Sequence, residues 1–190
     1  MSARREELTR VAARLFAERG YQGTSLADLA DALGLQKASL YHHIASKEDL
    51  LWEVAREGAA AFHAALDAVP AEAAATERIR LALRAHLAVV DAQLDVATVF
   101  VREWRFLSGE RRDEFVAERR RYEERVRALF RDGVERAELR TDLDVGTAAL
   151  LFLSAANWAY TWLRPGADIG ALADRLYAVL LDGMRGYATP

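Results

Sequence analysis

The sequence has no cysteine, which excludes disulfide bonds and thiolate metal sites. Only three of its 190 residues are proline, so little in the chain interrupts helices. No apolar run approaches the length of a membrane span, and the polar opening MSARREELTR is unlike a signal peptide. These absences predict a soluble, cytoplasmic protein with no membrane partner.

The common signatures of catalysis and cofactor binding are also missing. The chain contains no GxxxxGK[ST] loop, no GxGxxG and no HExxH, and no Glu-x-x-His pair for a di-iron bundle. The four histidines do not have metal-ligand spacing. We therefore expect no enzyme activity, no metal and no cofactor.

The residues that are abundant favour helix. Alanine, leucine, arginine and glutamate dominate a chain that is 52% apolar, and no alternating β pattern occurs. We predict an all-α fold of about nine helices. Apolar periodicity places them at residues 3–19, 26–33, 36–44, 47–69, 76–90, 94–107, 110–137, 144–163 and 168–184.

Residues 24–50 predict a helix-turn-helix. Ser25 and Asp28 have the spacing of a capping box, and Gly34 lies where the chain must turn sharply. The second helix, 36–44, presents hydrogen-bonding and cationic side chains that suit base edges and phosphates. An ordinary solvated helix in an architectural helix-turn-helix remains the alternative.

Charge limits how this segment would bind DNA. The whole chain is formally −3, and residues 1–50 contain seven basic and seven acidic side chains. A broad basic surface is therefore excluded. Binding would depend on a local arrangement of Arg4, Arg5, Lys37 and Lys47.

The run FAERGYQGTSLADLADALGLQKASLYHHIASKEDLL resembles the N-terminal signature of TetR-type transcriptional regulators. The resemblance implies a DNA-binding domain at 1–46, a ligand-binding and dimerisation domain at 47–190, and a dimer on a palindromic operator. It implies base contacts in the second helix and phosphate contacts around it. The DNA-binding residues that we expect are Thr24, Ser25, Gln36, Lys37, Ala38, Ser39, Tyr41, His42 and Lys47.

The last two predicted helices are apolar enough to need a partner surface. By the same resemblance, residues 144–186 would pack against a second copy as a four-helix bundle with C2 symmetry. The interface residues that we expect are Ala155, Ala159, Leu172, Leu176 and Val179.

Two later segments, REWRFLSGERR and NWAYTWLRP, resemble the branch of the family that senses acyl-CoA thioesters. This implies an apolar cavity for an acyl chain and cationic partners for the coenzyme A phosphates. Aromatic residues at helical spacing are also typical of an ordinary core. The ligand-binding residues that we expect are Phe100, Arg102, Trp104, Arg105, Arg119, Phe152, Asn157, Trp158, Trp162 and Arg164, with Asn157 bonding the thioester or pantetheine amides.

The sequence thus predicts a repressor that a small effector, an acyl-CoA thioester, releases from its operator. Two alternatives stay open. One is a TetR-type regulator of efflux that responds to a hydrophobic drug. The other is a helical interaction protein with no role on DNA.

Overall fold

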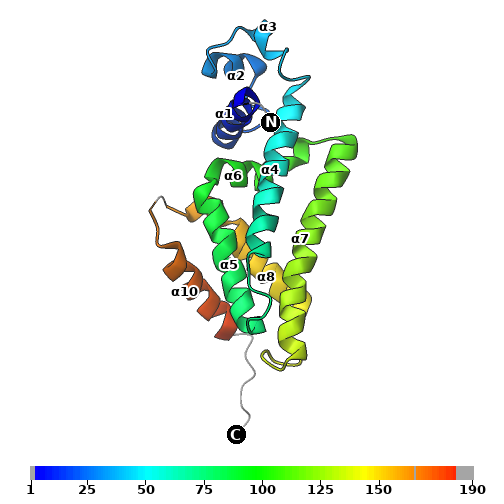
Figure 1. The fold of residues 1–190 in the computed structure, drawn as a ribbon, viewed down its shortest axis with the longest axis vertical. Coiled ribbons are helices and arrows are strands. Elements are labelled where there is room, and N and C mark those ends of the chain that lie inside the picture. The colour runs from blue at the N-terminus through cyan, green and yellow to red at the C-terminus, as the bar shows by residue number, and fades with distance from the viewer. Residues whose placement is uncertain (1–2, 165, 183–190) are drawn as a thin grey trace. The chain divides into compact units, whose positions relative to one another are not determined.

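The computed structural model describes residues 3–164 and 166–182. These residues form ten α-helices and one 3₁₀-helix, with no strand among them, so the all-α prediction is confirmed (Figure 1). The helices are α1 (Ala3–Arg19), α2 (Leu26–Ala32), α3 (Lys37–Leu40), α4 (Lys47–Asp67), α5 (Ala75–Ala92), α6 (Leu94–Arg102), η1 (Trp104–Phe106), α7 (Gly109–Glu135), α8 (Val145–Asn157), α9 (Ala159–Trp162) and α10 (Ile169–Asp182).

The chain divides into two compact units, each of which takes part of α4 and part of α7. The first unit contains the residues up to Ala60 together with Gln93–Glu118, and the second contains Ala61–Ala92 and the residues from Arg119 on. The predicted functional division into 1–46 and 47–190 follows a different criterion and stays a prediction.

The first unit is built on the buried face of α1. Leu8, Leu15 and Phe16 are almost wholly inaccessible, and α6 lies against this helix (Figure 1). Gly58 of α4 permits a close approach by α6, because a Cβ there would lie 3.0 Å from the Cβ of Phe100. The amphipathic helix that the apolar periodicity of residues 3–19 predicts is therefore present as α1.

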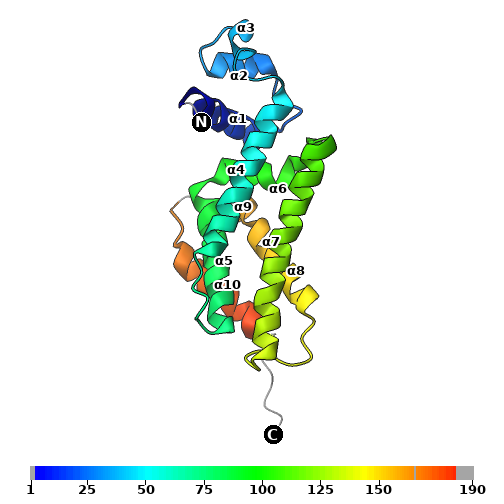
Figure 2. The same ribbon diagram turned by 45° about the vertical axis from the view of Figure 1, so that its right-hand side comes forward.

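The second unit is organised around α5, which packs against α8, α9 and α10. Figure 2 shows α10 running beside α5. The N-terminal end of α5 is closed by the carboxylate of Glu138, which accepts the Ala75 and Thr76 main-chain N–H groups at 3.1 and 2.9 Å. These hydrogen bonds lower the pKa of Glu138, the larger effect coming from Thr76.

Three predicted helices are broken or end more than two residues early in the structure. The second helix of the helix-turn-helix ends at Leu40, and residues 41–43 continue as a turn. The predicted helix at 144–163 splits at Trp158, whose carbonyl accepts the N–H and the hydroxyl of Thr161 in a tighter turn. The helix at 94–107 ends in η1. The predicted end of the last helix at Met184 lies outside the described residues.

No helix in the described part of the chain is both long enough and apolar enough to span a lipid bilayer.

Candidate nucleic-acid interface and candidate effector site

The first helix of the helix-turn-helix begins with the predicted capping box. The Asp28 N–H donates to the Ser25 hydroxyl at 3.1 Å, and the Ser25 N–H donates to the Asp28 carboxylate at 2.7 Å. Hydrogen bonds that the Ser25 hydroxyl and the Ser25 N–H donate to the Asp28 carboxylate lower the pKa of Asp28. Gly34 then has φ +64°, a conformation that glycine adopts without strain, as the sequence predicts for this turn.

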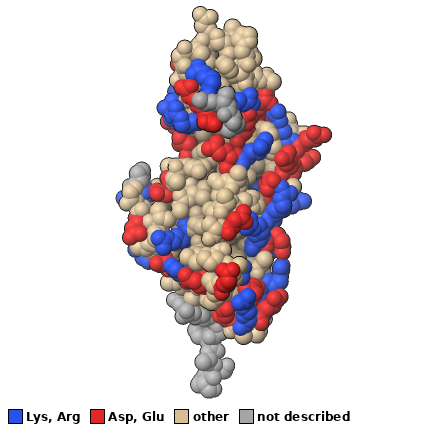
Figure 3. Space-filling model, in the orientation of Figure 1, with Lys and Arg blue, Asp and Glu red and all other residues tan. Residues whose placement is uncertain are grey.

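Helix α3 is short and is anchored by its apolar side. Leu40 is completely buried and Ile44 nearly so, while Gln36, Ala38, Tyr41 and His42 are exposed. Figure 3 shows few acidic or basic side chains on the face over α2 and α3. The exposed side chains described in this segment, Gln36, Tyr41 and His42, therefore offer hydrogen-bonding groups. The Lys37 side chain lies outside the described residues; Ser39 is half-buried and Ser25 exposed.

Two residues predicted to hold phosphates make hydrogen bonds within the protein in this structure. The Thr24 side chain is fully buried, and its hydroxyl bonds the Leu15 and Gly20 carbonyl oxygens at 3.1 and 3.0 Å. Lys47 Nζ donates to the Tyr21 and Thr24 carbonyls, both at 2.8 Å. The Thr24 hydroxyl is therefore used within the protein in this structure, and the phosphate contact of Thr24 stays a prediction.

Four predicted effector residues lie in the first unit. Phe100 is buried edge-to-face against Phe115, and Trp104 stacks on the same ring, with centroids 5.2 and 5.7 Å apart. Arg102 and Arg105 are exposed, and Arg105 Nε donates to the Arg102 carbonyl at 2.7 Å. In this unit the aromatic pair belongs to the core, which is the alternative that the sequence left open.

The other six predicted effector residues lie in the second unit, where three of them meet. Arg119, Asn157 and Trp158 line a pocket of about 400 Å³ between α7 and α8. Burial lowers the pKa of Arg119. Phe152 does not line this pocket, since it is fully buried against Phe130; Trp162 and Arg164 are exposed and lie outside the lining.

The predicted dimer residues differ in exposure. Val179 is 76% exposed, whereas Ala159 is completely buried within its own chain. Ala159 is therefore part of the protomer core in this conformation, and its place at an interface between two copies stays a prediction. Ala155, Leu172 and Leu176 are half-buried. Three large apolar side chains near them are more exposed than these: Leu150, Leu151 and Trp158.

Comparison with known proteins covers both parts of the chain. The model described as "Bacterial regulatory proteins, tetR family" matches residues 8–54, and "Tetracyclin repressor-like, C-terminal domain" matches residues 72–184. The chain belongs to the TetR family. It is therefore a transcription regulator whose helix-turn-helix is of the DNA-binding type.

Several TetR-family proteins are similar over almost the whole chain. The "HTH-type transcriptional repressor KstR2" of Rhodococcus jostii is 30% identical over 96% of this chain and 92% of its own. The structure of PfmR from Thermus thermophilus is 35% identical, with a TM-score of 0.84 over 92% of this chain and 97% of its own. AibR, solved with isovaleryl coenzyme A and operator DNA, is 30% identical with a TM-score of 0.85 over 94% and 98%.

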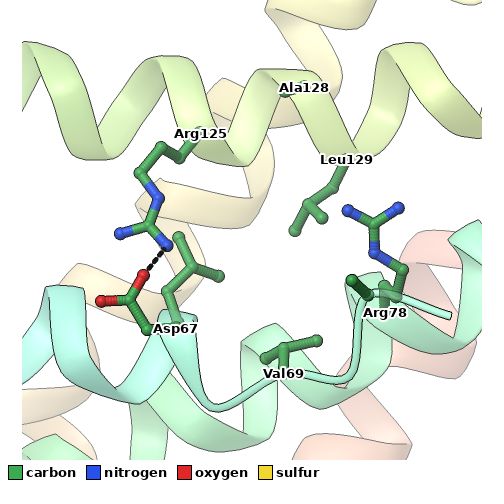
Figure 4. A pocket seen from close by; sticks show the side chains of 8 residues that line it. Asp67, Val69, Arg78, Arg125, Ala128 and Leu129 are labelled. Atoms are coloured by element: carbon green, nitrogen blue, oxygen red, sulfur yellow. Dashed lines mark hydrogen bonds and ion pairs between the residues drawn. The ribbon is translucent and has the colours of Figure 1, made fainter. Parts of the chain in front are cut away.

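The sequence analysis of this TetR-family chain missed a polar pocket in the second unit. Arg78 and Arg125 lie beside a cavity of about 330 Å³ that Val69 and Leu129 also line. Figure 4 shows Val69 and Leu129 on opposite sides of this cavity. Arg125 pairs with Asp67 and also bonds His63 Nδ1 at 3.0 Å. These residues come from α4, α5, α7 and the segment that follows α4, so no local motif marks them.

A buried acid in the first unit was also missed. Glu103 is only 5% exposed and accepts the Tyr21 main-chain N–H. The one available signal is a carboxylate placed directly before the aromatic run Trp104–Phe106. In the described residues, no group of three or more acidic, histidine or cysteine side chains is arranged to hold a metal ion.

Proposed function

We propose that this TetR-family regulator is a repressor that binds a palindromic operator as a homodimer and leaves it when an acyl-CoA thioester binds. The observation that supports DNA reading is the exposed row Gln36, Ala38, Tyr41 and His42, held in place by the buried Leu40. A helix of this kind presents its first residues to base edges in the major groove. Binding to an operator requires access to the cytoplasmic DNA, so we also propose that the protein is cytoplasmic.

Base and phosphate contacts divide between two groups in this proposal. Gln36, Ala38, Ser39 and His42 face the bases together with Lys37, and an adenine is the preferred partner of a glutamine side chain. Tyr41, Ser25 and Lys47 face the phosphates. Lys47 would give up its hydrogen bonds to the two main-chain carbonyls and bind a phosphate. Thr24 belongs to the same group in this proposal, and its hydroxyl would have to leave the Leu15 and Gly20 carbonyls to reach a phosphate.

The homodimer places two such helices on one face of the duplex, roughly 34–36 Å apart. Its support in this chain is the exposed apolar surface of α8 and α10, described above. A symmetric interface repeats each contact twice, so a few apolar side chains suffice to build it.

The effector proposal is supported by AibR, whose structure contains isovaleryl coenzyme A. It is supported in this chain by the pocket where Arg119, Asn157 and Trp158 meet, since one cation, one amide and one aromatic ring suit an anionic, amide-rich ligand with an apolar end. The thioester must bind the DNA-free conformation more tightly, because only differential affinity moves an equilibrium. Helix α4, which begins at Lys47, would carry the change to the helix-turn-helix.

The alternatives weigh less. Family membership disfavours a helical interaction protein with no role on DNA. Regulation of efflux by a hydrophobic drug has no feature in the described residues that favours it over the thioester, and it becomes an outcome of the test.

The test begins by selecting a DNA duplex from a random library with the purified protein. A palindrome bound in a salt-sensitive complex is the expected result. Isovaleryl-CoA, palmitoyl-CoA, the two free acids, free coenzyme A and a planar cationic drug are then titrated into this complex. Release by a thioester alone supports the proposal. Release by the drug alone, or failure to enrich any palindrome, would overturn it.

A further inference from the structure

A polar pair lies in the interior of the second unit, on helices α5 and α7. His86 is 1% exposed and Tyr122 is 8% exposed, and the His86 Nδ1 atom lies 2.9 Å from the Tyr122 hydroxyl oxygen. The Phe62 ring covers the imidazole with a centroid distance of 4.4 Å. The other ring nitrogen, His86 Nε2, is buried and bonds no atom of the described residues.

The hydrogen-bond pattern fixes which nitrogen of His86 carries the proton. Complete burial lowers the pKa of His86 to about 3, so the ring is neutral and has one N–H. Burial also raises the pKa of Tyr122, whose hydroxyl therefore keeps its proton. Among the described residues this hydroxyl has one acceptor, His86 Nδ1. Nδ1 accepts this bond, and the ring proton is on Nε2.

The pair does not serve stability in an obvious way. A buried N–H without an acceptor disfavours the folded state. The neighbouring buried positions of α5 are filled by Leu83 and Leu87, and a leucine at 86 would extend the same apolar stripe at lower cost. A partner that brings a neutral acceptor atom into the interior would complete the arrangement.

We propose that the Nε2–H of His86 binds the thioester carbonyl oxygen of the effector and that this bond distinguishes the thioester from other forms of the acyl group. The inference rests on the function proposed above and names the residue that reads the reacting group of the ligand. A thioester carbonyl is an uncharged acceptor. A free carboxylate would have to lose its hydration beside a neutral ring, which costs far more than one hydrogen bond returns.

Contacts lead from this pair to cationic side chains nearer the surface. The His63 ring stands edge-on to the Tyr122 ring at 5.5 Å, and its Nδ1 bonds Arg125. Arg125 lines the pocket of Figure 4, with Arg78 on the far side of the cavity. The proposal requires the acyl carbonyl to enter the interior beside His86, while the charged part of coenzyme A stays hydrated at the surface, either beside Arg119 in the pocket between α7 and α8 or beside these two arginines.

The test compares two ligands that differ at the carbonyl. Isovaleryl-, octanoyl- and palmitoyl-CoA are titrated into the wild-type protein by calorimetry, and the tightest is paired with its S-alkyl thioether, which lacks the carbonyl oxygen. We expect the wild type to bind the thioester about tenfold more tightly than the thioether. In His86→Leu this ratio should fall to about one, and in Tyr122→Phe it should fall partway, because the imidazole loses its support.

Thr98→Val is the matched control. Thr98 is also a buried polar residue, but its hydroxyl bonds the Leu94 carbonyl at 2.7 Å within its own helix. This variant should keep the wild-type ratio. The thermal midpoint of the ligand-free double variant His86→Leu/Tyr122→Phe adds a readout that needs no ligand. A midpoint equal to or above that of the wild type supports a binding role, and a clearly lower one shows that the pair is structural and overturns the proposal.

Two further outcomes overturn the proposal and separate it from the function it rests on. If the wild type binds both ligands equally, a buried water satisfies His86 and the regulator still responds to thioesters. If the wild type binds neither, the thioester function itself fails, and the reading of its carbonyl fails with it.

Discussion

The carboxylate of Glu103 accepts the main-chain N–H of Tyr21 at 3.0 Å. The bond lies within the first unit and joins the residue after α6 to the turn that precedes the helix-turn-helix. The Tyr21 ring stacks on Phe106 with centroids 5.4 Å apart and lies under Lys47 Nζ at 4.1 Å. Tyr21 therefore holds three elements together: the end of α1, the start of α4 and the 3₁₀-helix η1.

Replacing Glu103 with alanine should loosen this junction. The Tyr21 N–H would lose its acceptor, and we expect a loss of about 1–3 kcal/mol in the free energy of unfolding. Urea denaturation followed by circular dichroism measures it. Glu110→Ala removes an exposed acid from the same unit and should change stability by less than about 0.5 kcal/mol. Equal losses in the two variants would show that the Glu103 bond carries no stability.

Gln36→Ala should change which sequence the protein prefers. Gln36 is exposed at the start of α3, and its amide can pair with one base edge. We expect the selected operator to lose about 1–3 kcal/mol of binding free energy while random DNA loses little. Competition binding with both duplexes measures the difference. A uniform loss on the two duplexes would move Gln36 from the bases to the backbone.

Lys47→Ala should act in the opposite way. We expect weaker binding to all DNA sequences by about the same factor and a salt slope lower by roughly one unit. The structure adds a second effect, because Lys47 Nζ bonds two carbonyls of the turn before α2. The free energy of unfolding should fall by about 1–3 kcal/mol. An unchanged salt slope with reduced stability would show that Lys47 only supports the turn.

The sequence predicted what depends on local pattern. The capping box of Ser25 and Asp28, the turn at Gly34 and the long helices follow from spacing and backbone preference, and the structure confirms them. The direction of a side chain depends on neighbours distant in sequence. Thr24 could be recognised as a helix-flanking hydroxyl, but nothing local shows that the Leu15 and Gly20 carbonyls turn it inward.

The same limit applies to the candidate effector site. Phe100 and Phe152 have the composition of a cavity lining, yet each packs against another phenylalanine in a core. His86 lies on the buried stripe of α5. Its hydrogen bond to Tyr122 joins two helices, and the two residues are 36 positions apart in the sequence. Periodicity within one helix contains no information about such a pairing.

Acid should weaken the start of α4 through Asp49. Burial alone would raise the pKa of this carboxyl, but hydrogen bonds from Arg111 and Ser46 outweigh it and lower the pKa. A carboxyl with a lowered folded-state pKa contributes stability above its ordinary pKa of 3.8 and loses it as pH falls through the folded value. Asp49→Asn should therefore be less stable than the wild type at pH 7, with the gap narrowing below about pH 4.

Thermal unfolding at a series of pH values measures this gap. Asp113→Asn changes an exposed acid on α7, the helix that contributes Arg111, and should follow the wild-type curve throughout. A gap between Asp49→Asn and the wild type that stays constant down to about pH 2, below the ordinary range of carboxyl pKa values, would show that the side chain acts through its shape and not through its charge.

The homodimer should depend on the apolar side chains that one chain leaves exposed. Leu151 on α8 and Val179 on α10 are 51% and 76% exposed, and both lie in the region 144–186 that the sequence assigns to the interface. Glutamate at both positions would bury four charges in a symmetric dimer, because each substitution appears twice. We expect Leu151→Glu/Val179→Glu to be monomeric at micromolar concentration by light scattering, folded by circular dichroism, and at least about tenfold weaker on the palindrome. Glu123→Gln/Arg127→Gln removes a surface ion pair on α7 and should remain dimeric. A double glutamate variant that stays dimeric would place the interface on another surface.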